Sequence, residues 1–174
     1  LFLIENVMSS IAACVALETD ILTITSQLEK YSNNTHNNPG RFNMLNYKKS
    51  RIILDYAHNI DSINEICNYV DSVNGFKKKL VMYGPAGDRE EIVIKTIIDK
   101  LYKSFDVVIL FIDDKLLRGR TKEELIGMMN GKVIDSEKRA IDMSFDYMDQ
   151  NDYLSILLLD DVLNSIKYIQ SRCN

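Results

Sequence analysis

The chain has 174 residues, of which 46% are hydrophobic and 26% are charged. This balance excludes wholesale disorder and is enough for one well-buried core. The net charge of -4 does not suggest a nucleic-acid-binding protein, whose usual mark is a clustered excess of Lys and Arg. The basic run Lys77-Lys78-Lys79 is interpreted as the solvated entry to a strand.

The cysteines Cys14, Cys67 and Cys173 are odd in number and widely spaced, and the sequence has no Cys-x-x-Cys pair. This pattern argues against a disulfide framework or a zinc site and predicts a reducing, cytoplasmic location, with Cys14 and Cys67 buried in helices. The apolar first 17 residues include Glu5 and other polar residues, and they lack the basic start of a signal peptide. We therefore expect no membrane association. Because the chain begins with Leu, we expect a fragment that starts inside a longer protein.

Two helices are predicted at the start of the chain. Apolar residues at helical spacing predict a helix over 4–17, and Thr19 or Asp20 can cap a second short helix that carries Ile21, Ile24 and Leu28 on one side. Residues 32–40 are polar, rich in turn formers and without periodicity, so they predict a loop or an interdomain linker.

After this linker, continuous apolar strands alternate with amphipathic helices. Strands are expected at 51–54, 80–83, 107–112, 132–134 and 155–159. Helices are expected at 60–74, 88–103, 121–130, 136–149 and 160–171. The alternation predicts an α/β, three-layer, Rossmann-like domain in which helices flank a mostly parallel sheet. Ligands of such sheets bind beyond the carboxyl ends of the strands, so the residues that follow each strand are the first candidates for a site.

The first of these strands ends in Asp55-Tyr56-Ala57-His58-Asn59. An Asp in this place can accept hydrogen bonds from ribose hydroxyls, and His58 can bond to a phosphate-bearing ligand. The alternative is that Asp55 and Asn59 only cap the helix that follows. Composition alone favours the cap by a small margin.

The next strands end in weaker signals. Gly84-Pro85-Ala86-Gly87-Asp88-Arg89 precedes a helix whose free N–H groups suit an anion, but it matches no phosphate-binding motif, and a plain turn explains it equally. After the third strand, Asp113-Asp114 can hold magnesium, and Arg118-Gly119-Arg120 can hold a carboxylate or a phosphate. The alternative is a solvated loop in which these acids and arginines pair with one another. Asp160-Asp161 is interpreted as a helix N-cap and not as a metal site.

The linker itself holds a candidate. In Pro39-Gly40-Arg41-Phe42-Asn43 the arginine lies on a connection between domains, where it can reach a phosphate when the domains close. In isolation the same pentapeptide would be only a turn.

The chain resembles the C-terminal domain of the Mur ligase superfamily, and within it is most similar to the cyanophycin synthetases. The resemblance covers residues 4 to about 160 and depends on motifs that occur in the expected order, namely Pro-Gly-Arg-Phe-Asn at 39–43, Asp-Tyr-Ala-His-Asn at 55–59, Gly-x-x-Gly-Asp-Arg at 84–89 and Arg-Gly-Arg at 118–120. Asp-Tyr-Ala-His-Asn after a strand is the most specific of these motifs, and the others support it.

The resemblance implies two regions: residues 1–37 as the closing helices of a central ATPase domain plus a linker, and residues 38–174 as the C-terminal domain. It implies that Arg41 contacts ATP phosphates, that Asp55 contacts the ribose, and that His58 and Asn59 lie beside the interdomain cleft, with His58 a candidate catalytic group. The loops that hold Asp88, Arg89, Arg118 and Arg120 would face the incoming amino acid or peptide.

The implied reaction is ATP-dependent amide-bond formation through an acyl phosphate, assisted by Mg²⁺ and cationic side chains. The sequence contains no Gly-x-x-x-x-Gly-Lys-Ser/Thr, so ATP and Mg²⁺ are expected mainly on the N-terminal and central domains of the same polypeptide, and this chain is expected to be inactive alone. The family usually has Pro where Ile60 stands here, which should leave the nucleotide contacts intact.

Two other interpretations stay open. The first is a non-catalytic module of the same fold that binds a nucleotide or a partner. The second is a flavodoxin-like or receiver domain, suggested by the strand–helix alternation and Asp113-Asp114, but the spacing of its required Asp fits poorly. A P-loop encoded upstream of Leu1 would favour the ligase.

Overall fold

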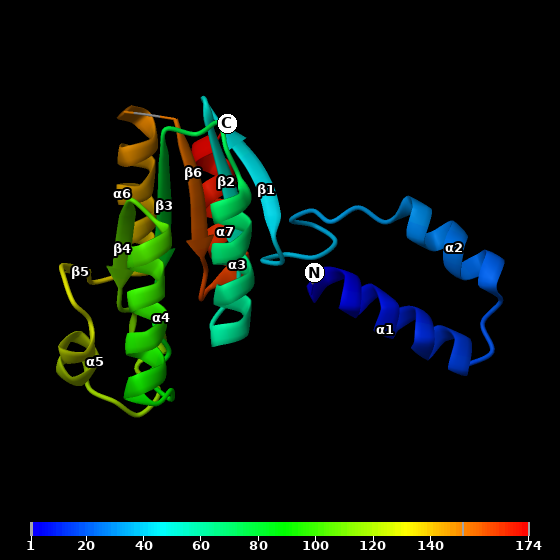
Figure 1. Ribbon diagram of the computed structural model, residues 1–174, viewed down its shortest axis with the longest axis horizontal. Helices are drawn as coiled ribbons and strands as arrows, with labels where there is room; N and C mark the ends of the chain where they lie inside the picture. Colours follow the sequence, from blue (N-terminus) through cyan, green and yellow to red (C-terminus); the bar gives the residue numbers. More distant parts are fainter. Residues whose placement is uncertain (1, 151, 174) are drawn as a thin grey trace. The chain divides into compact units, whose positions relative to one another are not determined.

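The computed structural model describes residues 2–150 and 152–173, which form two compact units that divide between Asn33 and Asn34. The first unit contains helices α1 (Phe2–Ala16) and α2 (Ile21–Lys30), in agreement with the two predicted helices (Figure 1). Asp20 is the N-cap of α2, where its carboxylate accepts a hydrogen bond from the N–H of Thr23 at 3.0 Å. Of the two predicted caps, the structure therefore uses the aspartate.

Most apolar side chains of the first unit are exposed. Ile24 is buried, but several other large apolar residues of this unit are more than half exposed, namely Ile4, Met8, Val15, Leu17, Ile21 and Leu22. Cys14 is half-buried, which differs from the expectation of a buried thiol, because two helices alone offer too little surface to cover it. The predicted apolar stripes therefore exist, but the described residues of this unit do not cover them.

The second unit is built on one six-stranded sheet in the order β1-β2-β6-β3-β4-β5. All neighbours are parallel except β1 and β2, which are antiparallel. The strands are β1 (Asn43–Tyr47), β2 (Ser50–Asp55), β3 (Lys78–Tyr83), β4 (Val107–Phe111), β5 (Val133–Ile134) and β6 (Tyr153–Leu158). The predicted mostly parallel sheet is confirmed. β1 was not predicted.

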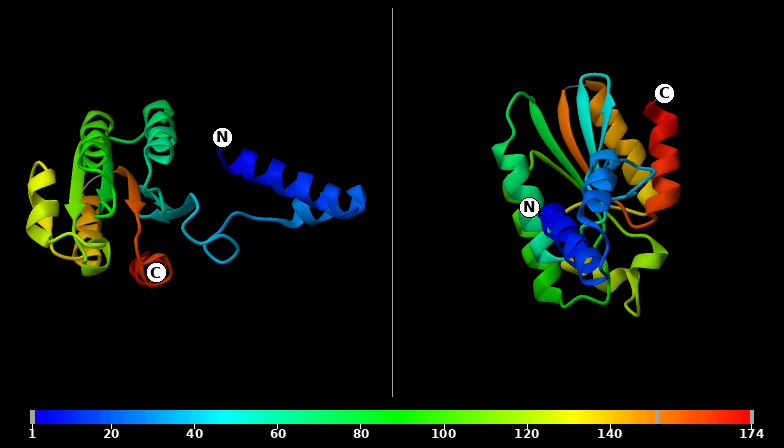
Figure 2. Two further views of the ribbon diagram at one scale, coloured as in Figure 1. Left: turned by 90° about the horizontal axis from the view of Figure 1, so that it is seen from below. Right: turned by 90° about the vertical axis from the view of Figure 1, so that its right-hand side faces the viewer.

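Helices cover both faces of this sheet (Figures 1 and 2). On one face, α3 (Ile60–Ser72), α4 (Glu91–Ser104) and α5 (Lys122–Met128) pack around a core that includes Ile53, Val81 and Ile156. On the other face, α6 (Glu137–Gln150) and α7 (Val162–Cys173) pack around Ile52, Leu54 and their neighbours. Consecutive strand residues point to opposite cores, which is why these strands read as continuous apolar runs.

Two further features complete the fold. A 3₁₀ turn, η1 (Asp114–Leu116), follows β4 and was not predicted. Cys67 is buried in the core below α3, as expected from its apolar helical pattern. Within the residues that the structure describes, no helix combines the length and the apolar character that a membrane crossing requires.

Candidate functional site

The parallel register brings the predicted motifs to one edge of the sheet. Asp55 pairs with Leu158, and β3 lies between β6 and β4, with Tyr83 opposite Leu110. The segments that follow β2, β3, β4 and β6 therefore meet at the carboxyl edge, where ligands of open parallel sheets bind. Motifs separated by about 100 residues in the sequence become neighbours there.

Asp55 joins the linker to the end of β2. Its side chain is only 2% exposed, and one carboxylate oxygen accepts the N–H of Phe42 at 2.8 Å. Burial raises the pKa of this carboxyl, while the backbone N–H of Phe42 and the positive charge of Arg41 act in the opposite direction. One step earlier in the linker, Gly40 N–H donates to the Asn43 side chain at 2.8 Å. Arg41 therefore stands between two anchored residues at the edge of the sheet.

Arg41, Tyr56 and His58 lie together. The guanidinium carbon of Arg41 is 5.9 Å from the centroid of the Tyr56 ring, and the rings of Tyr56 and His58 are 4.8 Å apart. His58 Nδ1 is 2.9 Å from the carbonyl oxygen of Tyr56. Because a carbonyl can only accept, Nδ1 carries the proton, and Nε2 is the ring nitrogen that can accept a hydrogen bond from a ligand.

Asn59 has the structural role that the cap interpretation gave it. It is the N-cap of α3, and its side-chain oxygen accepts the N–H of Ser62 at 2.8 Å. Asp55 does not cap this helix, because its carboxylate is directed to the linker. The two interpretations of the Asp-Tyr-Ala-His-Asn segment thus each describe a different residue.

The glycines after β3 are required by close packing. Gly87 donates its N–H to the carbonyl of Leu116 at 2.7 Å, and a Cβ on Gly87 would lie 2.0 Å from the carbonyl oxygen of Leu117. A Cβ on Gly84 would lie 2.6 Å from the side chain of Leu116. Neither glycine has a positive φ, so the tight turn expected from the sequence is not what demands them. The loops after β3 and β4 are therefore pressed together.

The two arginines after β4 have different environments. Arg120 donates from Nε to the Gly87 carbonyl at 2.6 Å and from Nη2 to the Arg89 carbonyl at 3.0 Å, so it braces the loop after β3. Arg118 has a positive φ of 43° and lies near two acids, with nitrogen–oxygen distances of 3.4 Å to Asp88 and 3.8 Å to Asp160. A hydrogen bond with the Tyr56 side chain and the charge of Asp88 raise the pKa of Arg118.

Arg89 carries an unsatisfied polar atom. Its Nε is buried and has no hydrogen-bond partner, and the nearest acid oxygen, from Asp88, is 4.0 Å away. Buried donors are nearly always bonded, so a donor left without a partner beside a candidate site is consistent with a ligand that supplies the acceptor. This observation favours the anion-binding interpretation of the loop after β3.

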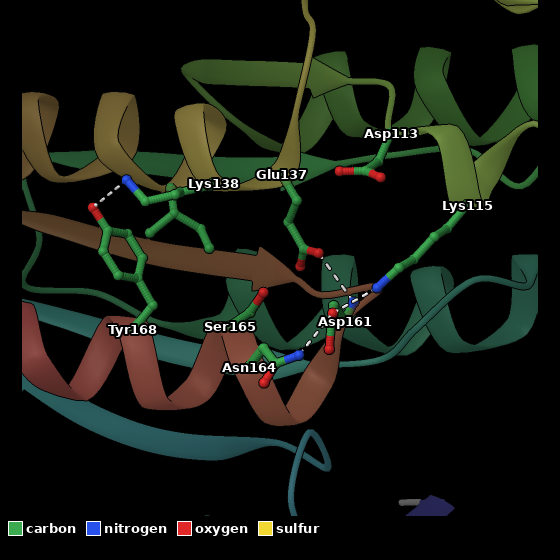
Figure 3. Close-up of a pocket in the computed structure, with 9 residues that line it drawn as sticks. Asp113, Lys115, Glu137, Lys138, Asp161, Asn164, Ser165 and Tyr168 are labelled. Carbon is green, nitrogen blue, oxygen red and sulfur yellow. Dashed lines mark hydrogen bonds and ion pairs between the residues drawn. The ribbon is translucent and has the colours of Figure 1, made fainter.

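Two pockets open at this end of the molecule. The smaller one brings together several of the motif residues and is lined by Tyr56, Ala57, His58, Gly84, Ala86, Leu116, Arg118, Leu158, Leu159 and Asp160. The larger one, of about 250 Å³, lies beside the motif residues between α6, α7 and the loop after β4 (Figure 3). We take the smaller pocket as the candidate site, because residues from three of the predicted motifs, among them His58, Gly84 and Arg118, line it together.

Glu137 lines the larger pocket beside the candidate site, and the sequence did not point to it. It is the first residue of α6, it is 5% exposed, and its carboxylate accepts the N–H groups of Asp160 and Asp161 at 3.0 Å each. Figure 3 shows Glu137 beside Asp161. Burial raises its pKa, against the effect of these N–H groups and of the Ser165 hydroxyl. An acidic residue in the first helical turn is common, so the sequence offered no signal that distinguished this one.

The described residues do not form a complete metal site. They include no group of three or more His, Cys, Asp or Glu side chains placed to hold an ion. Asp161 precedes α7 and bonds to Asn164 and Lys115, while Asp160 faces Arg118, which agrees with the expected helix cap.

The geometry defines a Rossmann-like α/β domain with a basic site at the carboxyl edge of its sheet. The family described as "Mur ligase, glutamate ligase domain" matches residues 40–157, which is most of the chain. The chain belongs to this family.

Individual relatives agree with this membership. A cyanophycin synthetase of Nostoc sp. is 28% identical over 183 residues, an alignment that covers 98% of this chain and 20% of that protein. A cyanophycin synthetase of Trichormus variabilis is 26% identical over 182 residues with the same coverage. The chain thus spans about a fifth of the length of the curated relatives it matches.

Solved structures agree on the fold. A pseudomurein peptide ligase type C from Methanothermus fervidus superposes with a TM-score of 0.67 at 22% identity, over 99% of this chain and 36% of that one. E. coli FolC in complex with ADP superposes with a TM-score of 0.60 at 23% identity, over 77% of this chain and 32% of that one.

Proposed function

We propose that this chain is the C-terminal domain of an ATP-dependent ligase that joins an amino acid or peptide to a carboxylate, in the manner of a cyanophycin synthetase. The family match over residues 40–157 supports the general kind of enzyme. The observation that carries the proposal is the position of Arg41, which is anchored beside Tyr56 and His58 at the carboxyl edge of the sheet. ATP would supply the phosphoryl group that activates the carboxylate as an acyl phosphate.

Residues on the linker side would serve the nucleotide. Arg41 would bind phosphate oxygens and stabilise the charge that develops on them. Asp55 would keep the arginine in place through Phe42, and a ribose hydroxyl would have to approach a carboxylate that is almost fully buried in this conformation. His58 Nε2 and Asn59 would line the same wall, with His58 as the candidate catalytic group.

Residues on the loops after β3 and β4 would serve the incoming amino acid or peptide. Arg89 has an unsatisfied Nε, and Arg118 is held by Asp88 and Asp160 at distances longer than a tight ion pair. Both suit a carboxylate ligand that replaces weak acid partners. Arg120 would contribute by bracing the loop that carries Asp88 and Arg89.

The remaining domains of the same polypeptide would complete the enzyme. We assign residues 1–37 to the closing helices of a central ATPase domain and its linker, and residues 38–174 to the C-terminal domain. The exposed apolar side chains of α1 and α2 support this assignment, since a larger domain would bury them. The phosphate cradle and the Mg²⁺ site would lie on those domains, so this chain alone is expected to be inactive.

The test uses a polypeptide extended N-terminally through a P-loop. We expect ATP hydrolysis that depends on an added amino-acid acceptor, and we expect Arg41→Ala to lower kcat about 100-fold, in line with the loss of one charge-stabilising donor. Arg139→Ala is the matched control, because Arg139 is exposed and pairs with Asp135, which lies just before its helix α6. Wild-type turnover in Arg41→Ala would contradict the role of Arg41.

The alternative is a non-catalytic module of the same fold that binds a nucleotide or a partner. An extended polypeptide that binds nucleotide but shows no acceptor-dependent hydrolysis with any amino acid would establish this alternative and overturn the ligase.

A further inference from the structure

The turn between β6 and α7 is held by a side chain from another helix. Glu137 of α6 accepts the N–H of Asp160 with one carboxylate oxygen and the N–H of Asp161 with the other, both at 3.0 Å. The Ser165 hydroxyl is a third donor to the same carboxylate. A buried carboxylate with three donors fixes its partners firmly, because each of them would otherwise lose a hydrogen bond away from water.

This contact is more than the cap of α7. Helix α7 begins at Val162, and Asp161 already serves its first turn by accepting a hydrogen bond from the Asn164 side chain at 3.1 Å. Glu137 instead binds the two N–H groups that precede the helix. It therefore determines the path of the turn and with it the direction of the two acidic side chains.

Each of these acidic side chains holds a cation from the loop after β4. Asp161 binds Lys115 Nζ at 2.7 Å, and Asp160, with a side chain only 14% exposed, lies 3.8 Å from Arg118 Nη2. Arg118 lines the smaller pocket together with Asp160. Glu137 is thus connected through the turn and the ion pair of Asp160 to Arg118, which lines the smaller pocket.

We propose that Glu137 is a positioning residue of the amino-acid site, which fixes the β6–α7 turn so that Asp160 orients Arg118 for the carboxylate of the incoming amino acid. This inference rests on the proposed ligase function. Glu137 does not touch the substrate. It acts through two backbone N–H groups and one ion pair.

The kinetic test is Glu137→Gln in the extended polypeptide. Glutamine has one acceptor oxygen, and its NH₂ group would face the second N–H, so the turn must shift. We expect KM for the amino acid to rise about tenfold, with kcat and KM for ATP unchanged, because the lost interaction binds ground state and transition state alike. An unchanged KM for the amino acid would overturn the proposal.

The matched control is Asp142→Asn on the same helix. Asp142 also links α6 to α7, but its hydrogen bonds go to Tyr168 and Arg172, which lie farther along α7 and not in the turn. We expect it to leave KM for the amino acid unchanged. An equal rise of KM in both variants would assign the effect to general packing of α6 on α7 and would overturn the role of Glu137.

A second measurement separates this inference from the ligase itself. In the 174-residue chain, the amide hydrogens of Asp160 and Asp161 should exchange slowly, and Glu137→Gln should accelerate both at least tenfold, while Asp142→Asn should not. Unchanged exchange in Glu137→Gln overturns the inference even if the ligase is active. Absence of turnover in the wild-type extended polypeptide overturns the proposed function instead.

Discussion

The acidic residues at the two ends of α6 differ in burial, in hydrogen-bond partners and in the direction of their pKa shift. At the first residue, Glu137 is buried, binds backbone N–H groups and has a pKa raised by burial. In the last turn, Asp149 is exposed and binds Lys48 at 2.6 Å and the Tyr47 hydroxyl at 2.7 Å. The hydrogen bonds from Lys48 and Tyr47 lower the pKa of Asp149. In the same helix, burial thus disfavours the charged form of Glu137, while hydrogen bonds favour the charged form of Asp149.

Other carboxyl groups show the same contrast between pKa values raised by burial and pKa values lowered by hydrogen bonds. Burial raises the pKa of Asp55 and Asp160, which lie with Glu137 at the carboxyl edge. Asp142, farther along α6, is also affected by burial, but hydrogen bonds from Tyr168 and Lys138 outweigh it and lower its pKa. Carboxyl groups with perturbed pKa values cluster at functional sites, so the concentration of raised pKa values at one edge of the sheet supports a functional role for that edge.

The largest expected effect in this comparison comes from Glu137→Ala. The substitution leaves two buried N–H groups without their acceptor, and we expect the free energy of unfolding to fall by about 2–3 kcal/mol. Urea denaturation of the 174-residue chain measures it. A loss below about 0.5 kcal/mol would show that water replaces the carboxylate and that the two ends of α6 do not differ in this respect.

A smaller effect concerns pH, and its sign differs between the two ends. The raised pKa of Glu137 means that its contribution to stability is complete below its unfolded value of 4.5 and is lost as pH rises through its folded value. The lowered pKa of Asp149 means that its contribution is present above 3.8 and is lost as pH falls through its folded value.

Unfolding free energies of wild type, Glu137→Gln and Asp149→Asn between pH 3 and pH 7 check these signs. The advantage of wild type over Glu137→Gln should shrink as pH rises, and its advantage over Asp149→Asn should grow. Curves that run in the same direction for both variants would remove the contrast between the two ends.

The smallest effect is expected for Asp149→Asn at neutral pH. Its partners Lys48 and Tyr47 are at the surface, where exposed ion pairs contribute little and are screened by salt. We expect the urea unfolding midpoint of Asp149→Asn to be close to that of wild type. The difference between the two midpoints should be insensitive to added salt. A loss as large as that of Glu137→Ala would mean that the exposed end of α6 matters as much as the buried one.

The apolar pattern was enough to predict the parallel strands and their helices, because each parallel strand is buried on both faces and each helix on one. It did not predict β1, because residues Asn43–Tyr47 form neither a continuous apolar run nor a strict alternation, and the strand pairs on one side only, at the edge of the sheet. The hairpin that joins β1 to β2 includes Lys48 at φ 52°, a conformation that side chains rarely adopt and that the sequence does not announce.

The candidate site was predictable in part. Asp55 and His58 could be proposed from their place after a strand, and the structure puts them at the carboxyl edge of the sheet. The division of labour between Arg118 and Arg120 could not be predicted, because it depends on which carbonyls of the loop after β3 come within reach. Glu137 could not be found, because its partners are backbone groups about 23 residues away.

The contact between Gly87 and the loop after β4 has a consequence for changing what this domain accepts. With a hydrogen bond of 2.7 Å and no room for even one methyl group, the two loops cannot be remodelled independently. A single loop transferred from another ligase would not pack against the neighbouring loop that remains. To change which amino acid the domain accepts, the segments after β3 and β4 should therefore be replaced together.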